Sequence, residues 1–264
     1  MAGRSLTKTG VWRLATARAI GGSHAKADLP CQDQIAYEVL GGSTIVAALA
    51  DGAGSAAFAE RGAEVAVETV RAELKRFVQD GRSDYSDMLR QATTTTRLAV
   101  IAEAARQGEE PRSFASTLLA IVITPQGGGA LQIGDGVIVV SAEGEGWNWV
   151  FWPQRGEYAN TTYFLTDEDS LNKAQVDLLP AEVLDVALTS DGLEPLGVHY
   201  ATQTVHDPFF TGLFRPLLAD EGEGEIHRVS ASLEQFLSSE RVRSRTDDDI
   251  SLILATRRPW NDPK

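Results

Sequence analysis

Residues 34–55 read QIAYEVLGGSTIVAALADGAGS, and this stretch sets the architecture expected of the chain. Two apolar, β-branched runs, Gln34–Leu40 and Thr44–Ala50, have the composition of strands, and Gly41-Gly42-Ser43 between them is a hairpin turn signal. Asp51 and Gly52 follow the second run directly. The stretch therefore predicts an antiparallel hairpin whose second strand ends in a carboxylate.

The same alternation of strands and tight turns extends over much of the chain. Two long segments, Ser55–Asp80 and Asp84–Gln107, instead have apolar residues at three- and four-residue steps, which predicts amphipathic helices, the first capped by Ser55. Helical character is also expected over Pro208–Ala219 and Ala231–Ser238, and a solvated loop over Asp220–Glu225. The further strands expected are Val11–Ala19, Ser116–Thr124, Gly129–Ile133, Val137–Ser141, Trp147–Trp152, Thr162–Leu165, Val183–Leu188 and Ile250–Thr256.

The arrangement of these segments favours one fold class. Strand clusters lie on either side of a helical pair and are joined by hairpins, with no regular strand–helix–strand alternation. Such a pattern is typical of antiparallel sheets covered by helices. We expect a single α+β domain spanning residues 1–264.

Composition narrows the classes of function. The 264 residues include 24 Lys and Arg against 37 Asp and Glu, a net charge of −13, which disfavours a nucleic-acid partner because phosphate contacts need basic residues. The longest apolar runs are too short to cross a membrane, and the N-terminus lacks the apolar centre of a signal peptide. Cys31 is the single cysteine, so no intrachain disulfide can form, and we expect it to pack as a small apolar residue. These features predict a cytoplasmic protein without a membrane partner.

Aspartates recur where apolar runs begin or end. Each Asp-Gly pair taken alone is an ordinary turn signal. As a set they suggest a cation site, because hard divalent cations prefer oxygen ligands and gathered carboxylates repel one another without a cation. The chain has only 4 His, with no pair at metal-ligand spacing, which favours Mg²⁺ or Mn²⁺ over Zn²⁺. The residues of this pattern are Asp33, Asp51, Asp135, Asp191 and Asp247–Asp249.

Taken in order, these segments resemble the type 2C (PPM-class) metal-dependent serine/threonine protein phosphatases. The similarity spans nearly the whole chain in the family's order, and GGSHAKADLPCQD with ADGAGSA looks like the bacterial branch with a stand-alone phosphatase domain. Each motif is weak alone, but six in order are specific. They are Gln32-Asp33, Ala50-Asp51-Gly52, Ser116-Thr117-Leu118, Gly134-Asp135, Ser190-Asp191-Gly192 and Asp248-Asp249-Ile250-Ser251.

The resemblance implies a fold, a reaction and a role for each matching residue. The fold would be a four-layer α-β-β-α sandwich of two packed antiparallel sheets flanked by helices. The reaction would be hydrolysis of phosphoserine or phosphothreonine in proteins by a metal-bridging hydroxide, without a covalent phosphoenzyme. Two or three Mg²⁺ or Mn²⁺ ions are implied. Asp51 would bridge two metal ions, and the Gly52 carbonyl would bind one of them. Asp191 and Asp248 would complete the ligands of the first ion, and Asp33 would bind the second directly or through water. Asp135 and Asp191 would hold a third, weaker ion.

The chain also departs from the family's pattern around the substrate. Ala53 stands where eukaryotic members often have a histidine proposed as general acid, and no arginine stands at the usual phosphate-binding position before Asp33. Gly136-Val137 replaces the usual Ser-Arg after the Gly-Asp pair. His24 and Lys26 are the alternatives nearby: His24 as acid or phosphate contact, Lys26 as phosphate contact. His24 is equally well interpreted as an ordinary loop residue.

Two other functions stay open at this point. The departures suit a catalytically weak or silent relative that acts as a regulatory binding module, and fold alone leaves room for a hydrolase of small phosphoesters. The main hypothesis is a monomeric phosphatase whose phosphoprotein substrate is made by a bacterial serine/threonine kinase.

Overall fold

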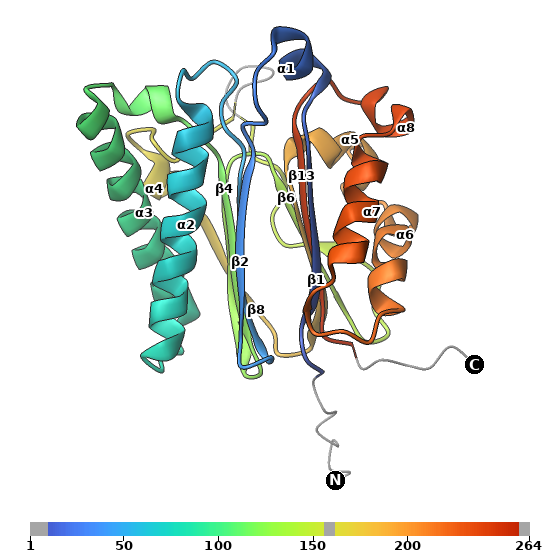
Figure 1. The fold of residues 1–264 in the computed structure, drawn as a ribbon. Helices are drawn as coiled ribbons and strands as arrows, with labels where there is room; N and C mark the ends of the chain where they lie inside the picture. Colours follow the sequence, from blue (N-terminus) through green and yellow to red (C-terminus); the bar gives the residue numbers. More distant parts are fainter. Residues whose placement is uncertain (1–9, 156–161, 259–264) are drawn as a thin grey trace.

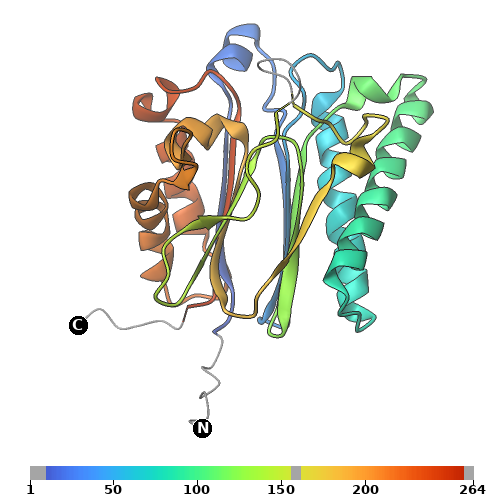
Figure 2. The ribbon, with the colours of Figure 1, turned by 180° about the vertical axis from the view of Figure 1, so that it is seen from behind.

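The structure, a computed structural model, describes residues 10–155 and 162–258 and has four layers (Figures 1 and 2). Two sheets pack face to face, and helices cover the outer face of each. The five-stranded sheet has the order β2 (Gln34–Leu40), β3 (Thr44–Ala50), β4 (Leu118–Thr124), β5 (Gly127–Ile133), β8 (Gln175–Leu179). The six-stranded sheet has the order β12 (Gly224–Glu225), β1 (Arg13–Ala19), β13 (Ile250–Thr256), β9 (Val183–Thr189), β6 (Val137–Ala142), β7 (Asn148–Trp149).

Helices form the two outer layers. Helices α2 (Ala59–Gln79) and α3 (Tyr85–Gln107) cover the five-stranded sheet, and α6 (Asp207–Leu218) and α7 (His227–Leu237) cover the six-stranded one (Figure 1). The short helix α1 (Gly22–Ala27) lies at one end of the sandwich, above the strand ends. The remaining elements are α4 (Ser170–Lys173), α5 (Glu194–Gly197), α8 (Glu240–Arg243), the 3₁₀ turns Pro111–Phe114 and Asp191–Leu193, and the small ribbon β10 (Val198–His199) with β11 (Thr204–Val205).

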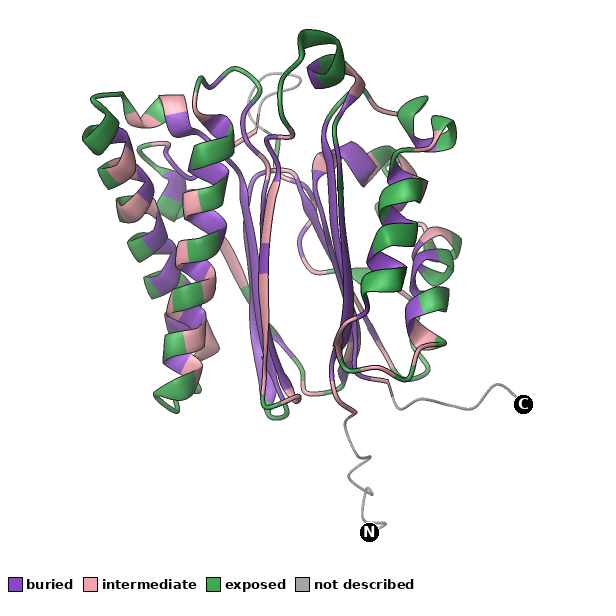
Figure 3. Ribbon diagram, in the orientation of Figure 1, coloured by how far each residue is buried: buried purple, intermediate pink, exposed green. Residues whose placement is uncertain are grey.

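The central strands are apolar throughout because both of their faces are covered. In β3, Ile45 and Leu49 pack between the two sheets, whereas Val46 and Ala48 pack under α2 and α3. All seven residues of β3, β4 and β13 are buried, as the colouring in Figure 3 makes visible. The same burial explains why their sequences read as continuous apolar runs rather than as an alternation.

The pairing of the strands is antiparallel except at one edge. The hairpin β2–β3 pairs Gln34 with Ala50, as the opening stretch predicted, and only the two-residue β12 runs parallel to its neighbour β1 among the described pairs. The predicted α+β class and the four-layer sandwich of two antiparallel sheets flanked by helices are therefore confirmed.

Four local predictions are wrong. Ser55 does not cap α2, which begins at Ala59 after Phe58. Trp147–Trp152 forms only the two-residue β7, and Thr162–Leu165 is not a strand. Aromatic and β-branched residues mimic strand composition there, but the rings of Trp147 and Trp152 pack against α6 and Tyr200 instead. Residues 220–225 are not all solvated loop, because Glu225 in β12 accepts hydrogen bonds from Tyr37 (2.6 Å) and Ser230 (2.9 Å).

In the ranges that the structure describes, none of the helices combines the length and apolar character that crossing a bilayer requires.

Candidate metal centre

Strand pairing brings the predicted aspartates to one end of the sandwich. Gln34 pairs with Ala50, so Asp33 and Asp51 lie side by side at the end of the five-stranded sheet. In the six-stranded sheet, Thr189 lies between Val137 of β6 and Leu252 of β13, which places Asp191 between the segments that carry Asp135 and Asp248. The two sheets thus contribute carboxylates from opposite sides.

These carboxylates surround a polar hollow of about 520 Å³. Asp51, Gly52, Asp135, Asp191 and Asp248 all line it, together with His24. Asp33 lies behind Asp51, fully buried. Five of the six residues predicted as metal ligands therefore line one hollow and Asp33 adjoins Asp51, although the six come from segments that span more than 200 positions of the sequence.

Asp51 and Gly52 are held by the start of β4. The Asp51 N–H donates to Oγ1 of Thr117 (2.9 Å), and the Thr117 N–H donates to the Asp51 carbonyl (2.8 Å). Gly52 pairs with Ser116 in an isolated bridge, and a Cβ on Gly52 would lie 2.9 Å from the carbonyl oxygen of Gln32. Only glycine fits this position, so the turn after β3 can pass close under the hollow.

Asp33 has the most unusual surroundings. Neither of its carboxylate oxygens has a hydrogen-bond partner of normal geometry among the described residues. Burial raises the pKa of Asp33 to about 6, although the nearby hydroxyls of Ser251 and Ser190 lower it in part. An unpaired buried carboxylate is costly unless a cation or a proton compensates it.

The neighbouring carboxylates share this electrostatic problem. Burial and then the negative charges of Asp33, Asp191 and Asp248 raise the pKa of Asp51 well above its ordinary value. Burial raises the pKa of Asp191 to about 7, with further contributions from Asp135 and Asp248, and its Oδ1 also lacks a partner. The pKa of Asp135 is raised by burial as well. Orphaned oxygens on clustered carboxylates fit hard divalent cations such as Mg²⁺ or Mn²⁺.

Of the two candidate substrate contacts, only one reaches the hollow. His24 is buried, lines the hollow and lies 2.8 Å through Nδ1 from Oδ2 of Asp249. Lys26 is exposed on α1 and is not among the lining residues. Among the described residues that line the hollow there is no lysine or arginine.

The sequence predicted no role for Asp249 or Glu194. Asp249 is 1% exposed and lies behind His24, and its signal was only its place in the triple acid before β13. Glu194, three residues after Asp191, has a pKa raised to about 7 by burial, and Arg155 lies 4.0 Å from its Oε1. Cys31, expected to be buried, is half-buried, and burial raises its pKa to about 12, so it is not a nucleophile at neutral pH.

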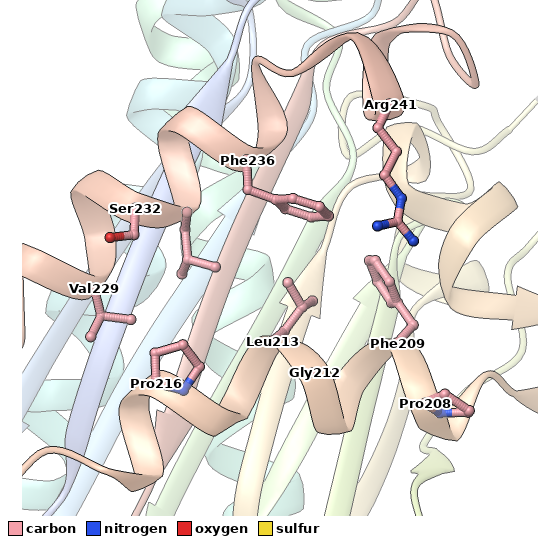
Figure 4. Close-up of a pocket in the computed structure, with 10 residues that line it drawn as sticks. Pro208, Phe209, Gly212, Leu213, Pro216, Val229, Ser232, Phe236 and Arg241 are labelled. Atoms are coloured by element: carbon pink, nitrogen blue, oxygen red, sulfur yellow. The ribbon is translucent and has the colours of Figure 1, made fainter.

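A second hollow, of about 300 Å³, lies between α6 and α7 and differs in character (Figure 4). Phe209, Leu213 and Phe236 point into it, and Arg241 of α8 lies at its rim. None of the described residues that line it carries a carboxylate, and it lies outside the strand-end cluster. The strand-end hollow is therefore the candidate site.

Comparison with known proteins agrees with this geometry. Residues 20–238 match the family Protein phosphatase 2C. Serine/threonine-protein phosphatase 3 of Escherichia coli (strain K12) is 38% identical over 249 residues, which cover 92% of this chain and 98% of that protein.

Solved structures share the fold at lower sequence identity. The catalytic domain of the serine threonine protein phosphatase PstP, in complex with 2 manganese ions, superposes with a TM-score of 0.64 at 20% identity over 93% of this chain and 98% of that one. The serine/threonine phosphatase Stp1 from Staphylococcus aureus superposes with a TM-score of 0.65 at 15% identity over 98% and 100% of the two chains. With the ordered aspartate motifs, the clustered carboxylates at the strand ends and a family match over most of its length, this chain belongs to the protein phosphatase 2C family.

Proposed function

We propose that the protein hydrolyses phosphoserine and phosphothreonine in phosphoproteins with the help of two or three divalent cations. One observation carries the proposal: Asp33 and Asp191 come from different sheets with buried oxygens that have no hydrogen-bond partner among the described residues, and burial and neighbouring carboxylates raise the pKa of Asp51 beside them. The relative in E. coli is named a serine/threonine-protein phosphatase, and the PstP structure holds 2 manganese ions. Both support the same activity for this chain.

The proposed ligands divide between the two sheets. Asp33, Asp51 and the Gly52 carbonyl come from the ends of β2 and β3, and Asp191 and Asp248 come from the β9 and β13 side. Asp135, whose charge acts most strongly on Asp191 among the charged neighbours, is placed to share a weaker third ion with it. When bound, Mg²⁺ or Mn²⁺ would supply Lewis-acid stabilisation of the phosphoryl oxygens and make a bound water more acidic.

The chain's own contribution is to hold these ligands still and to position the substrate. The strand ends are rigid, and the exchange of hydrogen bonds with Thr117 keeps the Asp51 carboxylate at the hollow. His24 is the proposed substrate contact, because it lines the hollow and Lys26 does not. The phosphoprotein substrate is proposed to come from a bacterial serine/threonine kinase, and the enzyme to act as a monomer.

The orphaned carboxylates also weigh against a silent binding module. Carboxylates that no cation uses would be buried at a continuing cost in stability. In a silent module nothing would offset this loss of folding stability.

Turnover of a phosphoserine peptide and of p-nitrophenyl phosphate in the presence of Mn²⁺ tests the proposal. Asp51→Asn should reduce turnover of both by more than about 100-fold, the scale that even residues behind the ligands reach. Asp247→Asn is the control, because it makes the same change at a carboxylate next to the proposed ligand Asp248 that is exposed and does not line the hollow. Wild-type protein that binds Mn²⁺ in calorimetry without turning over either substrate would favour the binding module, and full activity of Asp51→Asn would sink the proposed site.

A further inference from the structure

His24 and Asp249 form a buried pair at the wall of the metal hollow. The His24 Nδ1 lies 2.8 Å from Oδ2 of Asp249, and the two side chains are 11% and 1% exposed. The residues are 225 positions apart, one in α1 and the other directly before β13. Asp249 itself is not among the residues that line the hollow, and its side chain reaches the lining directly through the His24 imidazole.

The hydrogen bonds of Asp249 fix the state of the histidine ring. Oδ1 accepts the Gly21 N–H (2.7 Å), and Oδ2 accepts the Gln32 N–H (2.6 Å) as well as the contact from His24. Both oxygens of Asp249 already accept backbone N–H groups, so the side chain acts as an acceptor here and we assign Nδ1 as the donor to Oδ2. The carboxylate therefore orients the ring and leaves Nε2 as the nitrogen that can act on a substrate.

Nε2 points toward the turn that follows Asp51. A Cβ built on Gly54 would lie 3.9 Å from Nε2, so this nitrogen borders the Gly52–Gly54 segment that lines the hollow. The turn is kept open there by small residues, Gly52, Ala53 and Gly54. Gly54 has no side chain that could cover Nε2 from this side.

Among the described residues that line the hollow, His24 alone is suited to deliver a proton. Apart from His24 and the carboxylates, the described polar side chains that line the hollow are hydroxyls, which are poor acids at neutral pH. The carboxylates are the proposed cation ligands and must be ionised in that role. A departing serine or threonine alkoxide is a strong base, and a positioned proton donor contributes about 10²–10⁴-fold to such a step.

We propose that His24 is the general acid of the phosphatase reaction and that Asp249 is the residue that positions it; this inference rests on the proposed function. A water oxygen forms a bond to phosphorus while the bond from phosphorus to the seryl or threonyl oxygen breaks. The electron pair of that bond stays on the leaving oxygen, which takes the proton from Nε2 of the His24 imidazolium. The attacking water releases a proton to solvent, and His24 regains one from solvent before the next turnover. Asp249 takes no part in the proton transfer and holds the imidazole in place through the hydrogen bond between Oδ2 and Nδ1.

The dependence on the leaving group tests this role. A phosphoserine peptide needs a proton on its leaving oxygen, whereas the p-nitrophenolate released from p-nitrophenyl phosphate is stable without one. His24→Gln should therefore reduce kcat on the peptide by about 100-fold, within the range of general-acid effects, and reduce kcat on p-nitrophenyl phosphate far less. Asp51→Asn, which removes a proposed ligand, should reduce both to a similar extent.

A double-mutant cycle separates positioning by Asp249 from a purely structural role. Asp249→Asn should show the same preference for p-nitrophenyl phosphate as His24→Gln, and the double variant should lose no more activity on the peptide than His24→Gln alone. Thermal melting of each variant identifies any loss that comes from unfolding, and His24→Gln tests the acid by itself if Asp249→Asn does not fold.

The outcomes separate this inference from the proposed function. If the wild-type protein is active and His24→Gln loses the same kcat on both substrates, or none on either, His24 is not the general acid. If the double variant loses more activity on the peptide than His24→Gln alone, Asp249 does not act through His24, and its positioning role is overturned. Wild-type protein that hydrolyses neither substrate would overturn the proposed function and this inference with it.

Discussion

Asp51 and Thr117 exchange two hydrogen bonds between the end of β3 and the start of β4: N–H to Oγ1 at 2.9 Å and N–H to carbonyl at 2.8 Å. Thr117 is 2% exposed, so water does not compete for these bonds. The pair anchors the backbone from which the Asp51 carboxylate projects toward the hollow. The position of the proposed bridging ligand therefore depends on a hydroxyl that does not itself belong to the ligand set.

Replacing Thr117 tests this anchor. Thr117→Val keeps the shape but leaves the Asp51 N–H without its acceptor, which should lower Mn²⁺ affinity by about 10-fold, as loss of a residue behind the ligands does. The buried unpaired donor should also destabilise the fold by about 1–3 kcal/mol. Calorimetric titration and denaturant unfolding measure the two effects. Thr117→Ser retains the hydroxyl oxygen and should keep most of the Mn²⁺ affinity and most of the stability. Identical Mn²⁺ affinities in the wild-type protein, Thr117→Val and Thr117→Ser would contradict the role of Thr117 as an anchor.

The raised pKa values predict how metal stabilisation depends on pH. An unfolded chain ionises its aspartates near about 3.9, whereas the folded pKa is raised to about 6 for Asp33 and about 7 for Asp191. Between these values the folded protein holds protons that the unfolded chain has lost, so these groups make the metal-free fold less stable as pH rises. Metal ions replace those protons, so the stabilisation by metal should grow over the same range.

Melting temperatures with and without Mn²⁺ measure this difference. The rise in Tm caused by saturating Mn²⁺ should be larger at about pH 8 than at about pH 5, because the ligands are then free of protons. Taking the difference between the metal-bound and metal-free proteins cancels the titration of distant carboxylates. Asp51→Asn is the control and should lose most of the rise in Tm caused by Mn²⁺. A rise in Tm that is larger at about pH 5 than at about pH 8 would contradict the raised pKa values of Asp33 and Asp191.

Asp135 should contribute less than Asp51. Asp51 is surrounded by the charges of Asp33, Asp191 and Asp248, whereas Asp135 lies at the side of the cluster next to Asp191. Asp135→Asn should weaken the most weakly bound ion and lower turnover by about 10-fold, less than the loss of more than about 100-fold expected for Asp51→Asn. Counting bound Mn²⁺ by calorimetry, with turnover beside it, checks this order. Equal losses for the two variants would show that Asp135 is as central as Asp51.

Gly62 should be intolerant of any side chain. It lies in α2, and a Cβ there would stand 2.0 Å from the carbonyl oxygen of Phe114. Gly62→Ala should destabilise the protein by about 3 kcal/mol, the upper part of the usual overpacking range. Gly212→Ala in α6 is the matched control: its Cβ would meet nothing within 4 Å, so it should be stabilising by about 0.5–1 kcal/mol. Urea unfolding of both variants measures the contrast, and equal stabilities would refute the close approach.

Local patterns were sufficient where burial on both faces made them strong. The strands Thr44–Ala50 and Ile250–Thr256 begin and end where the apolar runs predicted, because a strand covered on both faces must be apolar along its whole length. The half-buried edge strand Gln34–Leu40 was located instead by the hairpin turn that follows it. The pattern was misleading in Trp147–Trp152 and Thr162–Leu165, where the same residue types serve packing between segments distant in sequence. The six-residue α1 and the half-exposed β8 were missed because neither has a full period of buried residues.

The sequence by itself determined which carboxylates stand at strand ends, because strand and turn signals are local and an Asp next to them needs no distant partner to be noticed. Only the tertiary structure decided what surrounds each of them: that Asp33 is buried without a hydrogen-bond partner of normal geometry in the described chain, and that Asp51 is anchored by Thr117. It also decided that Asp249 pairs with His24 rather than lining the hollow, and that Lys26 stays in solvent. Burial and partner choice depend on segments that meet only when the two sheets pack, so no window of sequence around these residues contains them.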